Sequence, residues 1–213
     1  MDVALIGATG FIGSHILDEL IRRDHQVTAL VRRPERVPQH PNVTATQVDV
    51  LDVDALTGLL APREAAISAF SADKGEGFYD SMVAGAKSII TAAKKAQLKR
   101  LLVVGGAGSL ETTPGGTQLL EEPSFPENWL GGAKGTREFL YMLREQPDLD
   151  WTFLCPAQVI QPGERTGKFR LGGDQLLTDD QGNSAISLQD YAVAMVDELE
   201  DPKHSRQRFS VAY

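Results

Sequence analysis

The chain has 213 residues and a formal net charge of −8, with acidic and basic residues spread along it. This excludes the clustered basic face that phosphate backbones require, so no nucleic-acid partner is expected. The single cysteine, Cys155, excludes an intrachain disulfide framework, and the histidines show no metal-ligand spacing with it. The first apolar run, residues 3–7, is too short for a signal peptide or membrane span. We therefore expect a cytoplasmic protein with no metal and no membrane partner.

Short apolar runs alternate with helical stretches along most of the chain. Six of the runs are predicted as buried strands, at residues 3–6, 27–31, 43–48, 65–70, 101–104 and 151–154. Helical periodicity between them is clearest at Met82, Ala86, Ile89 and Ala93, which share one helix face. The alternation indicates right-handed βαβ crossovers and an α/β class fold, a Rossmann-type doubly wound parallel sheet.

The first predicted strand runs directly into a glycine-rich turn that opens a helix. The turn reads Gly7, Ala8, Thr9, Gly10, Phe11, Ile12 and Gly13. Gly7 permits a tight turn, Gly10 lets the backbone approach a pyrophosphate, and Gly13 lets the helix pack close to the strand. Free N–H groups and a partial positive charge at the helix start favour phosphate. These seven residues are predicted to bind a dinucleotide; an ordinary strand-to-helix turn is the alternative.

Arg32 and Arg33 follow the second strand, where a site selective for NAD would place an acidic residue against the ribose 2′-hydroxyl. A guanidinium at this place suits a 2′-phosphate, which it can bind through two parallel hydrogen bonds. We therefore expect NADP(H) to be favoured over NAD(H). Two solvated loop arginines are the alternative.

The turn after the third strand is expected to border the adenine through Asp49, Val50 and Leu51. The Asp49 carboxylate can accept a hydrogen bond from the adenine amino group. Asp52 is expected to cap the helix that follows.

Loops after the fourth, fifth and sixth strands should line the nicotinamide half, because ligands of a doubly wound sheet lie outside the carboxyl ends of its strands. The residues selected in this way are Ser71, Gly105, Gly106, Ser109, Pro156 and Gln158. Ser109 is a catalytic candidate that can hydrogen-bond the carboxamide or the acceptor, with turn formation as the alternative. Gln158 is a candidate contact for the acceptor.

Two further residues are candidates for the acceptor side. Trp129 can close over the reacting rings and exclude water, although burial in the core is the commoner fate of tryptophan. Arg165, in the loop at residues 163–170, can meet a flavin phosphate; solvation of its charge is the alternative. Cys155 is expected to be buried and inert.

The last quarter of the chain has a looser pattern. Residues 156–182 are rich in glycine and suggest short extended pieces without a helix. Ser187 and Asp190 form a capping-box-like start for a helix that continues to about Leu199, and residues 208–212 suggest a final strand. We expect one domain over residues 1–213, with a dinucleotide-binding core at 1–155 and a substrate-side extension at 156–213.

Several segments together resemble a known family. The stretches GATGFIGSHI, LVRRPE, DVLD, VVGGAGSL, DWTFLCPAQVIQPGERTGKFRLG and ISLQDYAVAMVDELE are similar to atypical short-chain dehydrogenase/reductases, and more narrowly to the NmrA-like NAD(P)H-binding group that includes NADH-flavin reductase-like proteins. The resemblance implies a Rossmann fold, a bound dinucleotide and reduction of flavins or quinone-like acceptors. It also implies that Lys134 reaches the nicotinamide ribose, which makes it a second catalytic candidate; a solvated helix residue is the alternative.

The chain departs from the wider superfamily at its general acid. The usual tyrosine lies four residues before the lysine, and here that residue is Leu130. Reduction of a simple ketone loses a proton donor worth ~10²–10⁴-fold in rate, whereas a conjugated ring leaves a delocalised anion that water can protonate. This favours a small conjugated acceptor, with FMN or FAD as candidates. The alternatives are an NADP(H)-sensing regulator without turnover and, less favoured, a sugar epimerase or dehydratase; monomer and homodimer both remain open.

Overall fold

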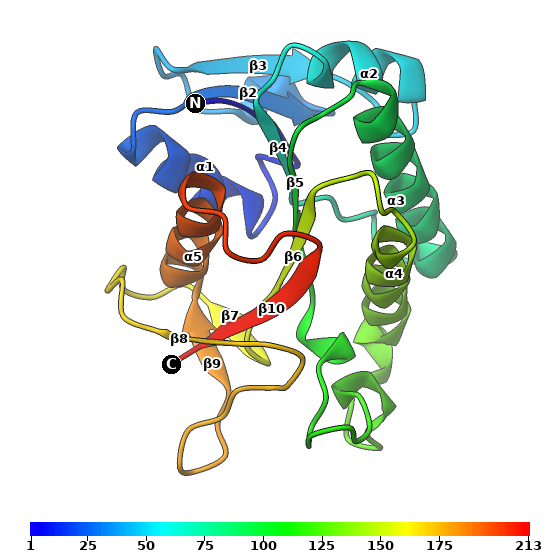
Figure 1. Cartoon of the computed structure of the whole chain (residues 1–213), viewed down its shortest axis with the longest axis vertical. Coiled ribbons are helices and arrows are strands. Elements are labelled where there is room, and N and C mark those ends of the chain that lie inside the picture. The colour runs from blue at the N-terminus through cyan, green and yellow to red at the C-terminus, as the bar shows by residue number, and fades with distance from the viewer.

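A computed structural model describes residues 1–213 as a twisted sheet with helices on both faces (Figure 1). The strands are β1 (Asp2–Ile6), β2 (Gln26–Val31), β3 (Val43–Gln47), β4 (Ala65–Ser68), β5 (Leu101–Val104), β6 (Trp151–Cys155), β7 (Val159–Gln161), β8 (Arg170–Gly172), β9 (Ala185–Ser187) and β10 (Gln207–Ala212). The helices are α1 (Gly13–Arg22), α2 (Val53–Leu60), α3 (Phe78–Lys95), α4 (Glu127–Arg144) and α5 (Leu188–Glu200). Short 3-10 helices span Pro34–Arg36, Ala107–Ser109 and Leu119–Glu121.

The main sheet has the order β3-β2-β1-β4-β5-β6-β10-β8, and only β8 runs antiparallel to its neighbour. The predicted doubly wound parallel sheet is thereby confirmed. The chain builds outward from β1 to β3 and then returns to place β4 on the other side of β1. In such a sheet this reversal opens a crevice at the carboxyl ends of the two central strands, where ligands bind.

Side chains of β1 alternate between two hydrophobic cores. Val3 and Leu5 face the core shared with α1 and α5, whereas Ala4 and Ile6 face the core under α2, α3 and α4. Figure 1 shows the same division, with α1 and α5 side by side on one face. Burial of both faces explains why the central strands are continuous apolar runs rather than alternating ones.

The six predicted strands and the long helix with Met82 and Ala86 on its buried face are present. Part of the substrate-side extension, residues 156–213, belongs to the main sheet. Its strands β10 and β8 extend the main sheet, and the buried Tyr191 of α5 donates a hydrogen bond of 2.7 Å to the carbonyl of Leu154 on β6. Core and extension therefore share one sheet.

The predicted start of α5 is half correct. The Ser187 hydroxyl accepts from the backbone N–H of Asp190 at 2.9 Å, as a cap does. The Asp190 carboxylate does not reach back to Ser187, because it accepts hydrogen bonds from Thr166, Gly167 and Tyr213 instead. Asp190 thus ties the glycine-rich segment and the C-terminal residue to α5.

Candidate functional site

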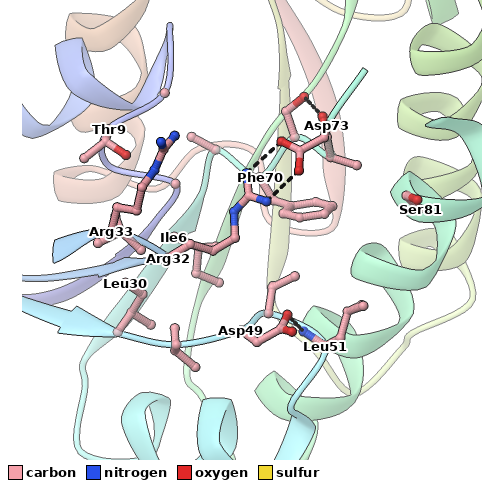
Figure 2. A pocket seen from close by; sticks show the side chains of 18 of the residues that line it. Ile6, Thr9, Leu30, Arg32, Arg33, Asp49, Leu51, Phe70, Asp73 and Ser81 are labelled. Carbon is pink, nitrogen blue, oxygen red and sulfur yellow. Dashed lines mark hydrogen bonds and ion pairs between the residues drawn. The ribbon is translucent and has the colours of Figure 1, made fainter. Parts of the chain in front are cut away.

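A cavity of about 630 Å³ lies at the carboxyl ends of the first four strands. Figure 2 shows its lining side chains, which come from the turns after β1, β2, β3 and β4. The lining residues are Ile6, Gly7, Thr9, Gly10, Leu30, Val31, Arg32, Arg33, Arg36, Val48, Asp49, Val50, Leu51, Ala69, Phe70, Ser71, Ala72, Asp73, Lys74, Gly75, Glu76 and Ser81. The cavity therefore occupies the crevice that the strand order creates.

The glycine turn after β1 has a backbone that only glycine permits. Gly7 has a φ of +80°, and a Cβ built on it would stand 2.5 Å from the Ala69 carbonyl oxygen that follows β4. A Cβ on Gly13 would stand 2.1 Å from the Gly7 oxygen, so α1 packs directly on the turn. The predicted tight turn at Gly7 and close helix packing at Gly13 are both confirmed.

The start of α1 offers unpaired donors. Ile12 stands at the N-cap position without a side-chain cap, and the first turn of the helix holds no acidic residue. The backbone N–H groups of Phe11, Ile12 and Gly13 donate to no acceptor in the chain, and the first amide within α1 that does so is that of Ser14, at 3.0 Å from the Gly10 oxygen. These three residues follow Gly10 but are not part of the cavity lining. Free amides at a helix N-terminus fit an anionic group, so this turn is suited to a pyrophosphate.

The two arginines after β2 differ in their contacts. Arg32 donates two hydrogen bonds, of 2.6 and 2.8 Å, to the carboxylate of Asp73 in the connection between β4 and α3. Arg33 forms no ion pair within the chain, and Figure 2 shows its guanidinium near Thr9 of the glycine turn. The structure thus brings both arginines to the cavity and leaves one of them free.

The turn after β3 holds Asp49, Val50 and Leu51 against the cavity. The Asp49 carboxylate accepts from the backbone N–H of Leu51 at 2.9 Å, which uses part of its capacity locally. The Val50 carbonyl accepts from the Ser88 hydroxyl of α3. Asp52 accepts from the N–H of Ala55 at 3.0 Å, which confirms it as the cap of α2.

The residues predicted after β5 and β6 do not line this cavity, and Ser71 is the only predicted acceptor-side residue that does. Gly105 is glycine because a Cβ there would stand 2.4 Å from the Phe153 ring. The buried Ser109 hydroxyl donates to the Gly106 carbonyl at 3.3 Å and lies 3.4 Å from Arg208. The Ser109 hydroxyl is therefore engaged by contacts within the protein.

The Cys155 sulfur lies 3.9 Å from the Ser109 hydroxyl and is fully buried. Burial raises the pKa of its thiol to about 11, so the thiolate is scarce at neutral pH. The expectation of an inert cysteine is consistent with this. Pro156, the next residue, is buried as well.

The remaining candidates lie outside the cavity. Trp129, in the first turn of α4, is 54% exposed, so it does not anchor the core. Lys134 and Gln158 are exposed. Arg165 donates to both oxygens of Glu19 on α1, at 2.8 and 2.7 Å, so its guanidinium is directed to that helix and not to an acceptor.

Sequence reasoning missed the connection between β4 and α3 as a wall of the cavity. Phe70, Asp73 and Lys74 all line it, yet only Ser71 of this segment was selected. The signal that points to them is positional, because the turn after the fourth strand must return over the crevice at the reversal of strand order.

None of the five helices is long and apolar enough to cross a bilayer.

Three solved structures match the chain over its full length with different provisional names. One, from Burkholderia pseudomallei, is provisionally named an exported protein; it has 45% identity and a TM-score of 0.90, with both chains covered completely. One, from Bacteroides thetaiotaomicron, is provisionally named an epimerase; it has 42% identity and a TM-score of 0.93, covering all of this chain and 96% of that one. One, from Streptococcus pneumoniae, is provisionally named an NADH-flavin reductase; it has 37% identity and a TM-score of 0.83, covering 100% of this chain and 99% of that one.

The family itself is identified by a profile described as NAD(P)H-binding, which matches residues 7–202. This span begins at Gly7 of the glycine turn and reaches just past α5. With the doubly wound sheet, the cavity at its strand reversal and this match, the chain belongs to the NAD(P)H-binding family of Rossmann-type proteins.

Proposed function

We propose that the protein is an NAD(P)H-dependent oxidoreductase that reduces a small conjugated acceptor of the flavin or quinone class. The observation that carries the proposal is the glycine turn. Gly7 and Gly10 line a cavity large enough for part of a dinucleotide, and the free amides of Phe11, Ile12 and Gly13 follow directly in the chain. A Cβ at Gly7 or Gly13 would collide with this backbone, so the shape of the turn depends on bare glycines. When bound, the dinucleotide supplies a hydride from its nicotinamide ring.

The choice of a conjugated acceptor rests on the absence of the superfamily's tyrosine from its usual position. Leu130 occupies the place of the superfamily tyrosine, and the nearest later tyrosine, Tyr141, accepts a hydrogen bond from Gln118 at 3.0 Å. Ser109 is buried against Arg208. An acceptor that delocalises the incoming charge is least affected by the missing donor, which is worth ~10²–10⁴-fold for a ketone.

The residues of the chain would then act by binding and orientation. The glycine turn holds the pyrophosphate, Asp49 and Leu51 border the adenine, and Arg33 meets a 2′-phosphate. Lys134 is assigned to the nicotinamide ribose, and Trp129 is assigned to the face of the acceptor. Holding two rings at reacting distance can supply roughly 7–11 kcal/mol of the barrier without acid or base catalysis.

NADP(H) is the proposed cofactor because of the cations after β2, Arg33 above all. A cytoplasmic site of action belongs to the same proposal, since reduced dinucleotide and a free cysteine both suit a reducing compartment. The proposed enzyme acts as a monomer or homodimer, with the acceptor and the dinucleotide as its only ligands.

The test measures binding and turnover separately. Calorimetry with NADPH and NADH establishes binding, and the decay of NADPH absorbance is then followed with FMN, FAD and a small quinone. Saturable oxidation with one of them supports the reductase. Tight NADPH binding without turnover of any acceptor would replace it with the second candidate, a sensor of NADP(H), and absence of binding by any dinucleotide overturns the assignment altogether.

A further inference from the structure

The ion pair between Arg32 and Asp73 spans the crevice from side to side. Arg32 is the first residue after β2, and Asp73 lies in the connection after β4. Because β1 stands between β2 and β4 in the sheet, the pair passes over the carboxyl end of β1, and both residues line the cavity. In Figure 2 the two side chains meet above the Phe70 ring.

The pair uses the strongest geometry that a guanidinium and a carboxylate can form. Nη1 and Nη2 of Arg32 donate to the two carboxylate oxygens of Asp73, at 2.6 and 2.8 Å. The hydrogen bonds from Arg32 lower the pKa of Asp73, and those to Asp73 raise the pKa of Arg32, so both remain charged at neutral pH. Both side chains are exposed, and exposed pairs contribute little to stability, so the fold does not depend on the charge of Asp73.

A 2′-phosphate would compete with Asp73 for Arg32. Phosphate and carboxylate oxygens bind the guanidinium fork in the same bidentate manner. Asp73 accepts from Nη1 and Nη2, so a phosphate can bind this end of the guanidinium only by displacing the carboxylate and is otherwise left with the Nε side. The carboxylate also repels a second negative charge in the same crevice. An unphosphorylated ribose carries no such charge and is spared this competition.

Arg33 provides the contrast within the same segment. It lines the cavity but forms no ion pair, and its guanidinium lies toward the glycine turn rather than toward Asp73. The two neighbouring arginines therefore differ in their availability to a phosphate. The Arg33 guanidinium is free, and the Arg32 guanidinium is paired with Asp73.

We propose that Asp73 is a cofactor-specificity residue, which holds Arg32 in a bidentate pair and thereby lowers the preference for NADPH over NADH that two free arginines would confer. The chain then accepts both dinucleotides, with Arg33 supplying the remaining preference for the 2′-phosphate. This inference rests on the proposed dinucleotide site and adds the residue that sets its selectivity.

The test compares dissociation constants for NADPH and NADH, and for the fragments 2′,5′-ADP and 5′-AMP, in four proteins: wild type, Asp73→Asn, Arg32→Ala and the double variant. Without the Asp73 carboxylate, Arg32 gains a charge-assisted hydrogen bond to the phosphate. Asp73→Asn should therefore lower the dissociation constants of NADPH and 2′,5′-ADP by about five- to tenfold. Binding of NADH and 5′-AMP should change less than twofold. In the Arg32→Ala background the same substitution should leave the ratio unchanged.

Asp80→Asn is the matched control, because Asp80 is an exposed acid in the first turn of α3 that forms no ion pair and does not line the cavity. It removes the same charge nearby and should leave the NADPH to NADH ratio as in wild type. An unchanged ratio in Asp73→Asn overturns the inference, as does an equal gain with Arg32 absent, which would indicate long-range charge alone. A selective loss of NADH affinity in Asp73→Asn would also overturn the inference, since it would mean that Asp73 binds the ribose directly. Failure of wild type to bind any dinucleotide refutes the proposed function itself.

Discussion

Gly13 lies so close to the carbonyl of Gly7 that a Cβ on Gly13 would stand 2.1 Å from the Gly7 oxygen. We predict that Gly13→Ala separates α1 from the turn and costs about 1–3 kcal/mol in the free energy of unfolding, as overpacking does elsewhere. The displaced turn should also lose affinity for dinucleotide. Denaturant unfolding and calorimetry measure the two effects.

Gly58 supplies the control for this prediction. It lies within α2, and a Cβ there would meet nothing within 4 Å. Gly58→Ala should therefore stabilise the fold by about 0.5–1 kcal/mol through helix propensity and leave dinucleotide binding unaltered. Equal behaviour of the two variants would show that the contact between Gly13 and Gly7 is not what shapes the turn.

Arg33→Ala should weaken NADPH more than Arg32→Ala does, because the Arg33 guanidinium is free and that of Arg32 is paired with Asp73. Loss of a hydrogen-bonded charge corresponds to about 1.5–3 kcal/mol, or roughly ten- to hundredfold in the NADPH dissociation constant. The variant that combines Arg32→Ala with Arg33→Ala should lose far more affinity for NADPH than for NADH. Equal losses of the two cofactors would mean that neither arginine contacts the 2′-phosphate.

Trp129→Ala tests the assignment of this exposed ring to the acceptor side. We expect kcat/KM for the acceptor to fall while the NADPH dissociation constant stays constant, because Trp129 is not among the residues of the dinucleotide cavity. Stability should change by less than about 0.5 kcal/mol, as for other surface positions. Trp129→Phe keeps an aromatic face and should retain most of the activity; full activity in Trp129→Ala would dismiss the ring as a lid.

Because of Asp190, the free energy of unfolding should decrease as the pH becomes acidic. Burial by itself raises the pKa of its carboxyl, but hydrogen bonds from Thr166, Gly167 and Tyr213 outweigh it and leave the pKa below its ordinary value. A group with a lowered native pKa stabilises the fold above its unfolded pKa, which is about 3.9 for aspartate, and that contribution disappears as pH falls through the native pKa.

The check is denaturant unfolding at a series of pH values. Wild type should lose stability as pH falls below about 4, and Asp190→Asn should be less stable at neutral pH by about 1–3 kcal/mol with a flatter dependence. Asp179→Asn is the exposed comparison. The hydrogen bond from the Asn183 side chain also lowers the pKa of Asp179, but this carboxylate is exposed and bonds only within its own turn, so the variant should change the pH dependence of stability less than Asp190→Asn does. Parallel pH curves for wild type and Asp190→Asn would show that other carboxyls govern the acid transition.

Local patterns along the chain were sufficient for the six parallel strands from β1 to β6 and for the glycine turn. Strands buried on both faces are continuous apolar runs, and a strand that passes through Gly7 and Gly13 into a helix has few other backbone conformations open to it. The caps at Asp52 and Ser187 are equally local, since each side chain bonds a backbone N–H three residues away. These features follow from neighbours in sequence, so sequence alone determined them.

Partners of the charged side chains were decided only by the tertiary structure. Arg165 pairs with Glu19 across 146 residues of chain, and Arg32 pairs with Asp73 across 41. Any exposed acid can satisfy an arginine, and which one stands within reach depends on how the connections after the strands fold back over the sheet. Sequence therefore determined the parallel strands and the glycine turn that border the crevice, whereas three-dimensional packing decided which cations remain free of an ion pair there.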